Sequence, residues 1–292
     1  MLPRSNRATK TIFKIFKGLK MSRLLNKITI TTLTALTLSL SSYPAAAAIV
    51  STEPQNNDWQ FAIAPYAWAV NMNGSTEVGP VHTNVDEDFG DIVEYLNGGG
   101  MLWMDVRKGK WSVFFNGLYA SLKENDNTKN GPFDVSAKSD FGLFSAGITY
   151  ELFRHKFANS ASQFIIEPYA GARYTVISST YTLEIKPNVF KATEETKHQW
   201  TDPIVGLRFT YDFNDNWDVI VAGDVGGTDR SDDYSYNVTG LLGYSSSDFL
   251  EEITWYAGYR TLKQKYITGS EENRFEWDMQ IFGPIIGFSF EF

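Results

Sequence analysis

Apolar and polar residues alternate along most of the chain from Asp58 onward, with a period of two. This is the period of a β-strand, because successive strand side chains point to opposite faces. In residues 205–212 one face is wholly apolar, and the other carries glycine, threonine and charged residues. Strands are therefore predicted at residues 59–72, 97–107, 111–124, 133–153, 163–185, 196–213, 217–227, 233–245, 250–267 and 275–292.

Aromatic residues and connections distinguish a membrane barrel from a soluble β-sandwich, since both folds share the two-residue period. Aromatic side chains gather toward the strand ends, as in interfacial girdles, and the polar faces mix glycine with charges of both signs, as in a filled barrel interior. Short connections such as 107–110 alternate with longer polar ones such as 121–133 and 186–197. The pattern favours a closed antiparallel transmembrane β-barrel. A soluble barrel is the residual alternative, and it would need a polar outward face.

The strand count depends on residues 74–96, which allow two interpretations. The segment is either an extracellular hairpin with a short helix in the 86–97 region or an additional strand pair. Bacterial single-chain barrels have an even number of strands. The sequence therefore predicts an all-β fold of about ten strands, with eight or twelve left open.

The N-terminal segment has the organisation of a secretory signal peptide. Residues 2–27 carry eight basic residues and no acid, the apolar stretch 28–40 follows, and Pro44 precedes the small residues Ala45–Ala48. This order is that of a basic region, a short apolar core and a cleavage site. We expect residues 1–48 to be a cleaved signal peptide, 49–57 a linker and 58–292 the barrel. Translation starts at either Met1 or Met21.

Composition narrows the possible chemistry. The chain has no cysteine, which excludes disulfides, thiol nucleophiles and thiolate metal sites. Its formal net charge is −8, so a nucleic-acid partner is not expected. The mean hydropathy of −0.25 is typical of a soluble protein, but it is also compatible with strands that alternate apolar and polar residues.

The last strand carries the most specific signal. Phe288, Phe290 and Phe292 share one face with the apolar residues before them. This ending resembles the C-terminal assembly signal of outer-membrane proteins. Together with the segments 65–68 (PYAW), 91–94 (DIVE), 203–208 (PIVGLR) and 256–260 (YAGYR), it resembles the small OmpA-like and opacity-like outer-membrane barrel family over residues 58–292. The resemblance implies the outer membrane of a Gram-negative bacterium, with both termini in the periplasm. It also implies contacts with outer-membrane lipid and lipopolysaccharide, the outer-membrane assembly machinery and periplasmic chaperones.

Charged residues on the predicted inward faces are the main candidate site. Three Gly-x-Arg triplets place Gly171 with Arg173, Gly206 with Arg208 and Gly258 with Arg260 on one face. A guanidinium buried in a narrow lumen needs a carboxylate partner. The pattern predicts either an interior ion-pair network or a charged constriction in a narrow pore. The predicted network comprises Asp105, Glu151, Glu167, Arg173, Arg208, Asp212, Asp218, Asp224 and Arg260.

Other polar clusters point to no catalytic, metal or cofactor site. The densest acidic cluster is Asp86, Glu87, Asp88, Asp91 and Glu94, which does not have the spacing of an EF-hand. We interpret it as a solvated loop and helix start capped by Asp88 or Asp91, with a divalent-cation site as the alternative. The three histidines, His82, His155 and His198, have no serine or aspartate at a spacing typical of a catalytic pair.

Three functions follow from these patterns. The first is a non-enzymatic outer-membrane protein with a structural or surface-loop binding role and a lumen filled by Arg/acid pairs. The second is a narrow passive channel for ions or small solutes. The third is an enzyme that modifies lipid at the barrel rim. Inward arginines and acids that pair across the lumen would favour the first, whereas charges on opposite walls would favour the second. A histidine beside a serine or aspartate at the rim would favour the third.

Overall fold

The computed structural model describes residues 58–127, 133–158, 160–185, 190–228, 232–245 and 253–292. The predicted signal peptide, residues 1–48, and the predicted linker, residues 49–57, lie outside the described residues. Within the described ranges, no helix has both the length and the apolar character needed to cross a membrane.

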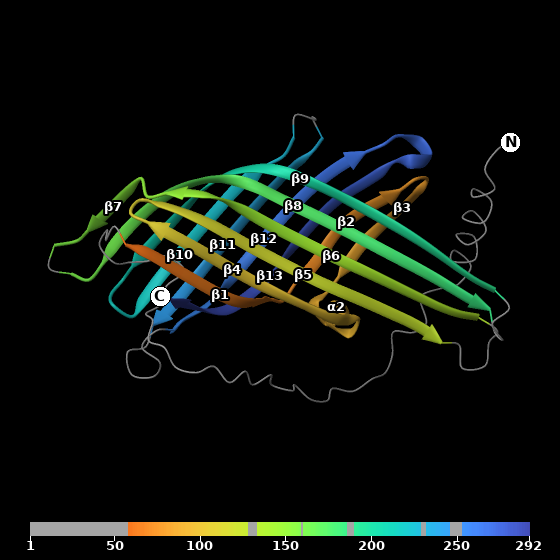
Figure 1. The fold of residues 1–292 in the computed structure, drawn as a ribbon, viewed down its shortest axis with the longest axis horizontal. Coiled ribbons are helices and arrows are strands. Elements are labelled where there is room, and N and C mark those ends of the chain that lie inside the picture. The colour runs from red at the N-terminus through yellow and green to blue at the C-terminus, as the bar shows by residue number, and fades with distance from the viewer. Residues whose placement is uncertain (1–57, 128–132, 159, 186–189, 229–231, 246–252) are drawn as a thin grey trace. The chain divides into compact units, whose positions relative to one another are not determined.

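The described chain is almost entirely strand (Figure 1). One short α-helix and one 3-10 turn interrupt it. The elements are β1 Trp59–Trp68, β2 Asn71–Val78, β3 Val81–Glu87, α2 Phe89–Glu94, β4 Leu96–Lys108, β5 Trp111–Asn127, β6 Phe133–Tyr150, β7 Phe153–Lys156, β8 Gln163–Ile185, β9 Phe190–Asp212, β10 Trp217–Gly226, β11 Tyr234–Ser245, β12 Ile253–Thr268, η2 Glu271–Asn273 and β13 Phe275–Glu291.

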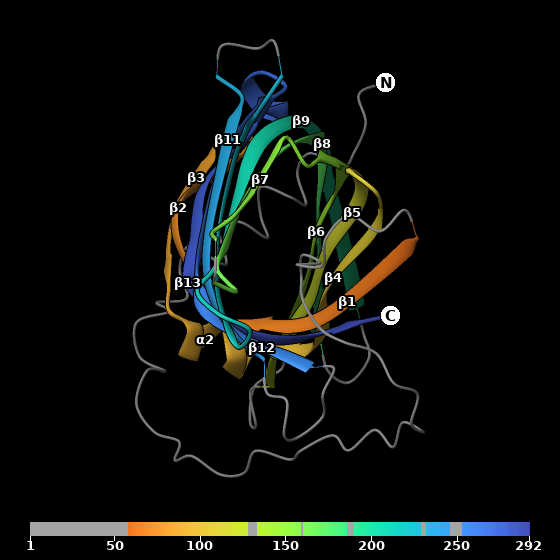
Figure 2. The ribbon, with the colours of Figure 1, turned by 90° about the vertical axis from the view of Figure 1, so that its left-hand side faces the viewer.

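The strands form one antiparallel sheet that closes on itself, because β13 pairs with β12 on one side and with β1 on the other. Figure 2 shows the strands as a ring. The barrel wall is ten strands around. β1 and β2 together count as one of the ten, because both pair with the same edge of β13. Within the described chain, β3 pairs with β2 alone and β7 with β8 alone. The ten-strand prediction and the short helix in the 86–97 region are therefore confirmed, and residues 74–96 form a hairpin followed by a helix.

Ala69 and Val70 separate β1 from β2, and the register with β13 is the same on both sides of this break. Opposite the break, Gly283 has φ +156°, and a Cβ there would lie 1.9 Å from the carbonyl oxygen of Ala69. On the other edge, β1 pairs with β4 over Trp59–Pro65, whereas β2 pairs with β3. Residues 96–100 of β4 consequently pair only with β5 among the described strands.

Two predicted connections are wrong, because strand pairing continues through them. Residues 121–133 and 186–197 were expected to be polar loops. Instead β5 runs on to Asn127, where it still pairs with β6, and β9 begins at Phe190, opposite Ile185 of β8. A paired strand with both faces in water is polar at most positions, so its sequence resembles that of a polar loop. The connection between the predicted strands 133–153 and 163–185 contains β7, which pairs with Phe164 and its neighbours on β8.

The wall reverses its polarity along its length. We call the end with Trp59 and Phe292 the terminal end and the end with the β2–β3 and β8–β9 hairpins the hairpin end. On β12 the outward residues are Trp255, Ala257 and Tyr259 toward the terminal end, and Thr261, Lys263 and Lys265 toward the hairpin end. On β13 they change from Ile286 and Phe282 to Gln280, Asp278 and Glu276. The outward apolar band therefore covers only the part of the wall toward the terminal end.

The interior has the opposite gradient. Toward the hairpin end it is filled by an apolar cluster that we call the apolar plug: Trp68, Leu118, Leu143, Trp200, Leu262, Phe275, Trp277, Met279 and Ile281. Toward the terminal end the buried inward residues are largely charged or polar. Thus the hairpin end is built like a water-soluble barrel and the terminal end like a membrane-spanning one.

Candidate functional site in the barrel lumen

The inward residues of β5 show how the lumen is layered. Ser112, Phe114, Asn116 and Leu118 are consecutive inward positions, each buried. Ser112 belongs to a charged network, Phe114 lines a cavity, Asn116 belongs to a second polar network and Leu118 to the apolar plug. Because every second residue of a strand points inward, these four residues of β5 lie in four successive layers of the lumen, each of different chemistry.

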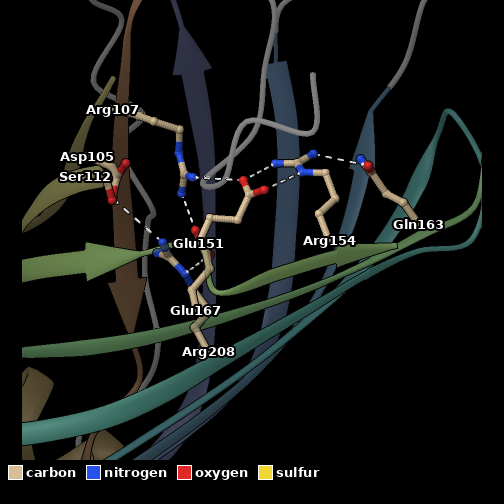
Figure 3. A network of polar contacts seen from close by, with 8 residues as sticks. All are labelled: Asp105, Arg107, Ser112, Glu151, Arg154, Gln163, Glu167 and Arg208. Carbon is tan, nitrogen blue, oxygen red and sulfur yellow. Dashed lines mark hydrogen bonds and ion pairs between the residues drawn. The ribbon is translucent and has the colours of Figure 1, made fainter. Parts of the chain in front are cut away.

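The layer nearest the terminal end is centred on Glu167 of β8, which is fully buried (Figure 3). Its carboxylate accepts a hydrogen bond from Arg107 on β4 and another from the Nε of Arg208 on β9, at 2.8 Å. A carboxylate that accepts from two guanidinium groups has most of its oxygen lone pairs satisfied without water. Glu167 therefore joins two arginines from separate parts of the wall.

Glu151, Arg154 and Asp105 extend this layer. The Glu151 carboxylate lies 3.5 Å from Arg107 and 2.7 Å from Arg154, and Arg154 donates to Gln163 at 3.1 Å. Asp105 accepts from Ser112 at 3.2 Å and lies 3.9 Å from Arg208. Figure 3 shows these side chains, which come from separate strands, converging on one another. The layer therefore connects β4 with β8 and β9 across the lumen.

A second polar layer is centred on Asp224 of β10. Its carboxylate pairs with Arg173 of β8 at 2.5 Å and accepts from Tyr169 at 3.1 Å and Asn237 at 3.0 Å. Arg173 also donates to Ser235 at 3.2 Å. Arg173 is one of the largest fully buried side chains, so this ion pair is shielded from bulk water.

Arg260 departs from the predicted Arg/acid pairing. Its Nε donates to the side-chain oxygen of Asn237 at 2.8 Å, and its Nη1 donates to Asn116 at 3.3 Å and to Tyr66 at 3.4 Å. The guanidinium also lies 4.8 Å from the ring centre of Trp68. Asn237 and Asp224 form the link between Arg260 and Arg173. Within the described chain, the hydrogen-bond partners of this buried cation are neutral.

All nine predicted network residues are buried, but they do not form one network. Asp105, Glu151, Glu167, Arg173, Arg208 and Asp224 are in ion pairs. Asp212 instead accepts from Gln163 at 2.6 Å. Asp218 lies opposite Asp212 on the neighbouring strand and forms no ion pair within the described ranges. The prediction that these two acids pair with arginine is wrong, because both lie beyond the layer that contains Arg208.

Sequence reasoning missed Arg107 and Arg154. Arg107 was assigned to the short connection 107–110, and Arg154 falls in the connection between the predicted strands 133–153 and 163–185. In the structure Arg107 is the last inward residue of β4, and it is 4% exposed. The signal was present in the sequence, since Arg107 lies two positions after Asp105 and must share its face.

The glycines of the Gly-x-Arg triplets lie where neighbouring chain segments come close. A Cβ on Gly171 would lie 2.1 Å from the carbonyl oxygen of Ala146, and one on Gly258 1.9 Å from that of Gly240. At these two positions glycine allows the neighbouring strand's backbone to approach closely. At Gly206 the ring of Tyr169 occupies the space as well.

A cavity of about 110 Å³ lies between the two polar layers. Arg208 and Thr149 line it toward the terminal end, and Arg173 and Arg260 toward the hairpin end. Most of the remaining wall is apolar or aromatic: Ala64, Trp103, Phe114, Ile204, Ile220, Leu241, Tyr256 and Ile285. The lumen is thus closed toward the terminal end by the charged layer around Glu167 and toward the hairpin end by the apolar plug. The cavity lies between these two closures.

The histidines do not form a rim dyad in the described chain. The ring of His198 stacks on Phe275 at a centroid distance of 3.7 Å, and His155 lies between Phe153 and Phe157. His82 has Asn84 at 3.2 Å and Glu77 at 4.0 Å, on the outward face of the β2–β3 hairpin. None of these contacts pairs a histidine with a serine or an aspartate.

The acidic cluster surrounds the start of α2. Asp88 occupies the N-cap position, but its side chain makes no capping hydrogen bond. Asn71 of β2 supplies that acceptor instead, at 2.9 Å from the backbone nitrogen of Phe89. Burial raises the pKa of Glu87, and the carboxylates of Asp91, Asp86 and Asp88 raise it further. The cluster is therefore under electrostatic repulsion.

The phenylalanines of the predicted assembly signal lie on the outward face of β13. Phe288 packs on Trp255 at 5.4 Å and on Phe290 at 5.3 Å. The backbone of Phe292 exchanges two hydrogen bonds of 2.9 Å with Phe61. These residues thus lie at the seam where the barrel closes.

Comparison with known proteins identifies the fold but not the family. No family model and no curated protein sequence matches the chain. The structure of the outer membrane protease OmpT from Escherichia coli has a TM-score of 0.51 at 10% identity, covering 82% of this chain and 99% of that one. Ail, the attachment invasion locus protein of Yersinia pestis, in complex with sucrose octasulfate, has a TM-score of 0.35 at 8% identity, covering 80% and 98%. The translocator domain of the autotransporter NalP from Neisseria meningitidis has a TM-score of 0.31 at 10% identity, covering 81% and 90%.

The chain therefore has the fold of an outer-membrane β-barrel, a fold shared by proteins of unlike function. The finer assignment to the OmpA-like and opacity-like family stays a prediction.

Proposed function

We propose that this protein is a non-conducting, non-enzymatic outer-membrane barrel that acts through its surface at the hairpin end. The observation that carries the proposal is the double closure of the lumen, by the Glu167 layer toward the terminal end and by the apolar plug toward the hairpin end.

The Glu167 layer supports the proposal because it pairs charges across the lumen. A conducting constriction would hold its charges on opposite walls with water between them. Here Arg107 of β4 reaches Glu167 of β8, and Arg208 of β9 reaches the same carboxylate. Separating these groups would leave buried charges without partners, at a cost of about 3–5 kcal/mol for each pair broken.

The apolar plug gives independent support. It contains three large aromatic side chains at or near full burial, Trp68, Trp200 and Trp277. Trp200 packs on Tyr266 at 4.7 Å with nearly parallel rings, and Trp277 on Phe141 at 6.2 Å. Close-packed side chains leave no continuous path for a hydrated ion.

The polarity gradient of the wall supports the proposed location and orientation. The outward apolar band near the terminal end would contact lipid, with Trp59, Trp111 and Trp217 at its edge. The polar wall beyond it would project from the outer surface, past the lipopolysaccharide headgroups. The β5–β6 and β8–β9 hairpins are the longest of these projections (Figure 1). They are the parts of the protein that we expect to meet a partner.

Single-channel recording of the refolded mature chain in a planar bilayer tests the proposal. We expect no steady conductance steps, with insertion shown independently by a heat-dependent shift in gel mobility. Arg208→Ala should remain silent, because the apolar plug is intact in it. Asp278→Asn, on the outward face of the wall, is the matched control for a charge change that cannot affect the lumen. Steady steps in the wild type whose ion selectivity changes in Arg208→Ala, but not in Asp278→Asn, would establish a channel instead.

A further inference from the structure

The cavity between the two polar layers has an unusual balance of charge. Its lining includes three arginines, Arg173, Arg208 and Arg260, and one acid, Asp224. Arg208 is neutralised by Glu167 at 2.8 Å and Arg173 by Asp224 at 2.5 Å. Arg260 is 6% exposed, and its described hydrogen-bond partners are Asn237, Asn116 and Tyr66, none of which carries a charge.

A buried cation without a counter-charge is costly, because hydrogen bonds to neutral groups replace only part of its hydration. The nearby carboxylate of Asp224 already accepts from Arg173, Tyr169 and Asn237. Asp202 lies beside Arg173 in the strand register and accepts from Gln264 at 3.3 Å. Neither carboxylate is a hydrogen-bond partner of Arg260, so the described residues leave this guanidinium at the cavity wall without a directly paired counter-charge.

Unsatisfied hydrogen-bond donors point to the same requirement. Four residues that line the cavity have buried polar atoms without a hydrogen-bond partner in the described chain: the Nε of Arg173, the Nη2 of Arg208, the Nε1 of Trp103 and the Oγ of Ser145. The first three can only donate, and the hydroxyl can donate. Arg173 and Ser145 are 1% and 5% exposed. An occupant that accepts hydrogen bonds would satisfy donors of this kind.

We propose that the cavity is a binding site for a small organic monocarboxylate. One uncompensated guanidinium calls for one negative charge, and a planar carboxylate matches the two parallel donors of a guanidinium. The aromatic and aliphatic wall formed by Trp103, Phe114 and Ile220 suits an apolar body attached to that carboxylate. The volume of about 110 Å³ is smaller than a cavity of roughly 150 Å³ that holds benzene, so the apolar body must be smaller than an aromatic ring. Butyrate, which has a short aliphatic body, is therefore the suitable probe.

The test refolds the mature chain with butyrate labelled with carbon-13 at the carboxyl group, so that the closed lumen does not limit access. We expect a bound carboxyl resonance that saturates at one butyrate per chain, and no bound state with butan-1-ol labelled at the same carbon, which lacks the charge. Arg260→Gln should weaken butyrate binding by about 10- to 150-fold, the range that corresponds to a lost hydrogen bond between charged groups.

Two alanine substitutions keep the test independent of the arginine network. Ala222 lines the cavity, so Ala222→Leu should fill part of it and abolish binding while the chain still folds. Ala170 faces outward on β8, so Ala170→Leu adds the same side chain without entering the cavity and should bind butyrate like the wild type.

Three results would overturn the proposal. The first is the absence of a bound resonance in the folded wild type, which would mean that water alone occupies the cavity. The second is unchanged binding in Ala222→Leu, which would place the butyrate elsewhere. The third is displacement by chloride at equal concentration, which would make the site one for an inorganic anion. None of these results bears on conductance, so the proposed closure of the lumen stands or falls separately.

Discussion

Glu167→Gln is the substitution that tests most directly whether the charged layer holds the barrel together. Glutamine keeps the size of the side chain but removes its charge, so two buried guanidinium groups lose their common counter-ion. Removing one partner of a buried ion pair costs about 3–5 kcal/mol, because the remaining charge stays buried without compensation. Since both Arg107 and Arg208 are affected, we expect the loss in the free energy of unfolding to lie at or above the upper end of that range.

The assay is reversible urea unfolding of the chain in lipid vesicles, followed by tryptophan fluorescence. With a urea dependence of about 1–3 kcal/mol per molar, a loss of about 5 kcal/mol lowers the unfolding midpoint by roughly 2–5 M. The control is Asp278→Asn. Asp278 pairs with Lys263 on the outward face, where both side chains are partly exposed. Such a pair contributes about 0–1 kcal/mol.

A loss of less than about 1 kcal/mol for Glu167→Gln would refute the reasoning. It would mean that water already compensates Arg107 and Arg208, and therefore that the layer is hydrated rather than sealed. The same result would weaken the proposal that the lumen is closed, because a hydrated layer is compatible with conduction. Equal losses in Glu167→Gln and Asp278→Asn would lead to the same conclusion.

Three further predictions concern other parts of the chain. Trp277→Ala should lower the free energy of unfolding by about 3–5 kcal/mol, whereas Gln280→Ala on the outward face should change it by less than about 0.5 kcal/mol in the same assay. Gly258→Ala should destabilise the barrel, because its Cβ would meet the Gly240 carbonyl oxygen, whereas Gly240→Ala, with nothing within 4 Å, should not. A carbon-13 NMR titration should place the pKa of Glu87 above 4.5, and Asp91→Asn should lower it. This raised pKa means that Glu87 contributes stability at low pH, and that this contribution is lost as the pH rises through the folded value.

The strand pattern could be predicted because a two-residue period determines which side chains share a face. All nine residues expected to point inward do so, including Asp212 and Asp218, which have no arginine partner. Which inward charges meet could not be predicted in the same way. Arg107 reaches Glu167 although 60 positions separate them. That contact depends on the register offset between neighbouring strands around the barrel, and this offset cannot be read from the sequence of any one strand.

The neutral surroundings of Arg260 could not be predicted for the same reason. Asn116 lies 144 positions away along the chain and Tyr66 lies 194 away. The reversal of polarity along the wall was visible in the sequence, since Lys263 and Lys265 follow Tyr259 on the outward face of β12. In residues 186–197 the change to polar outward residues was interpreted as a loop, because loop residues are also polar.

The seam between β1 and β13 has a consequence for when the barrel can form during synthesis. The Nε1 of Trp68 donates to the carbonyl oxygen of Gly283, 215 positions further along the chain. The wall therefore cannot close before β13 has been made, because β13 supplies the pairing partner of both β1 and β12. Until then, any strands that have paired leave open edges, and such edges invite pairing with other chains. A barrel that closes only at β13 depends on being kept apart from its neighbours until that strand is available.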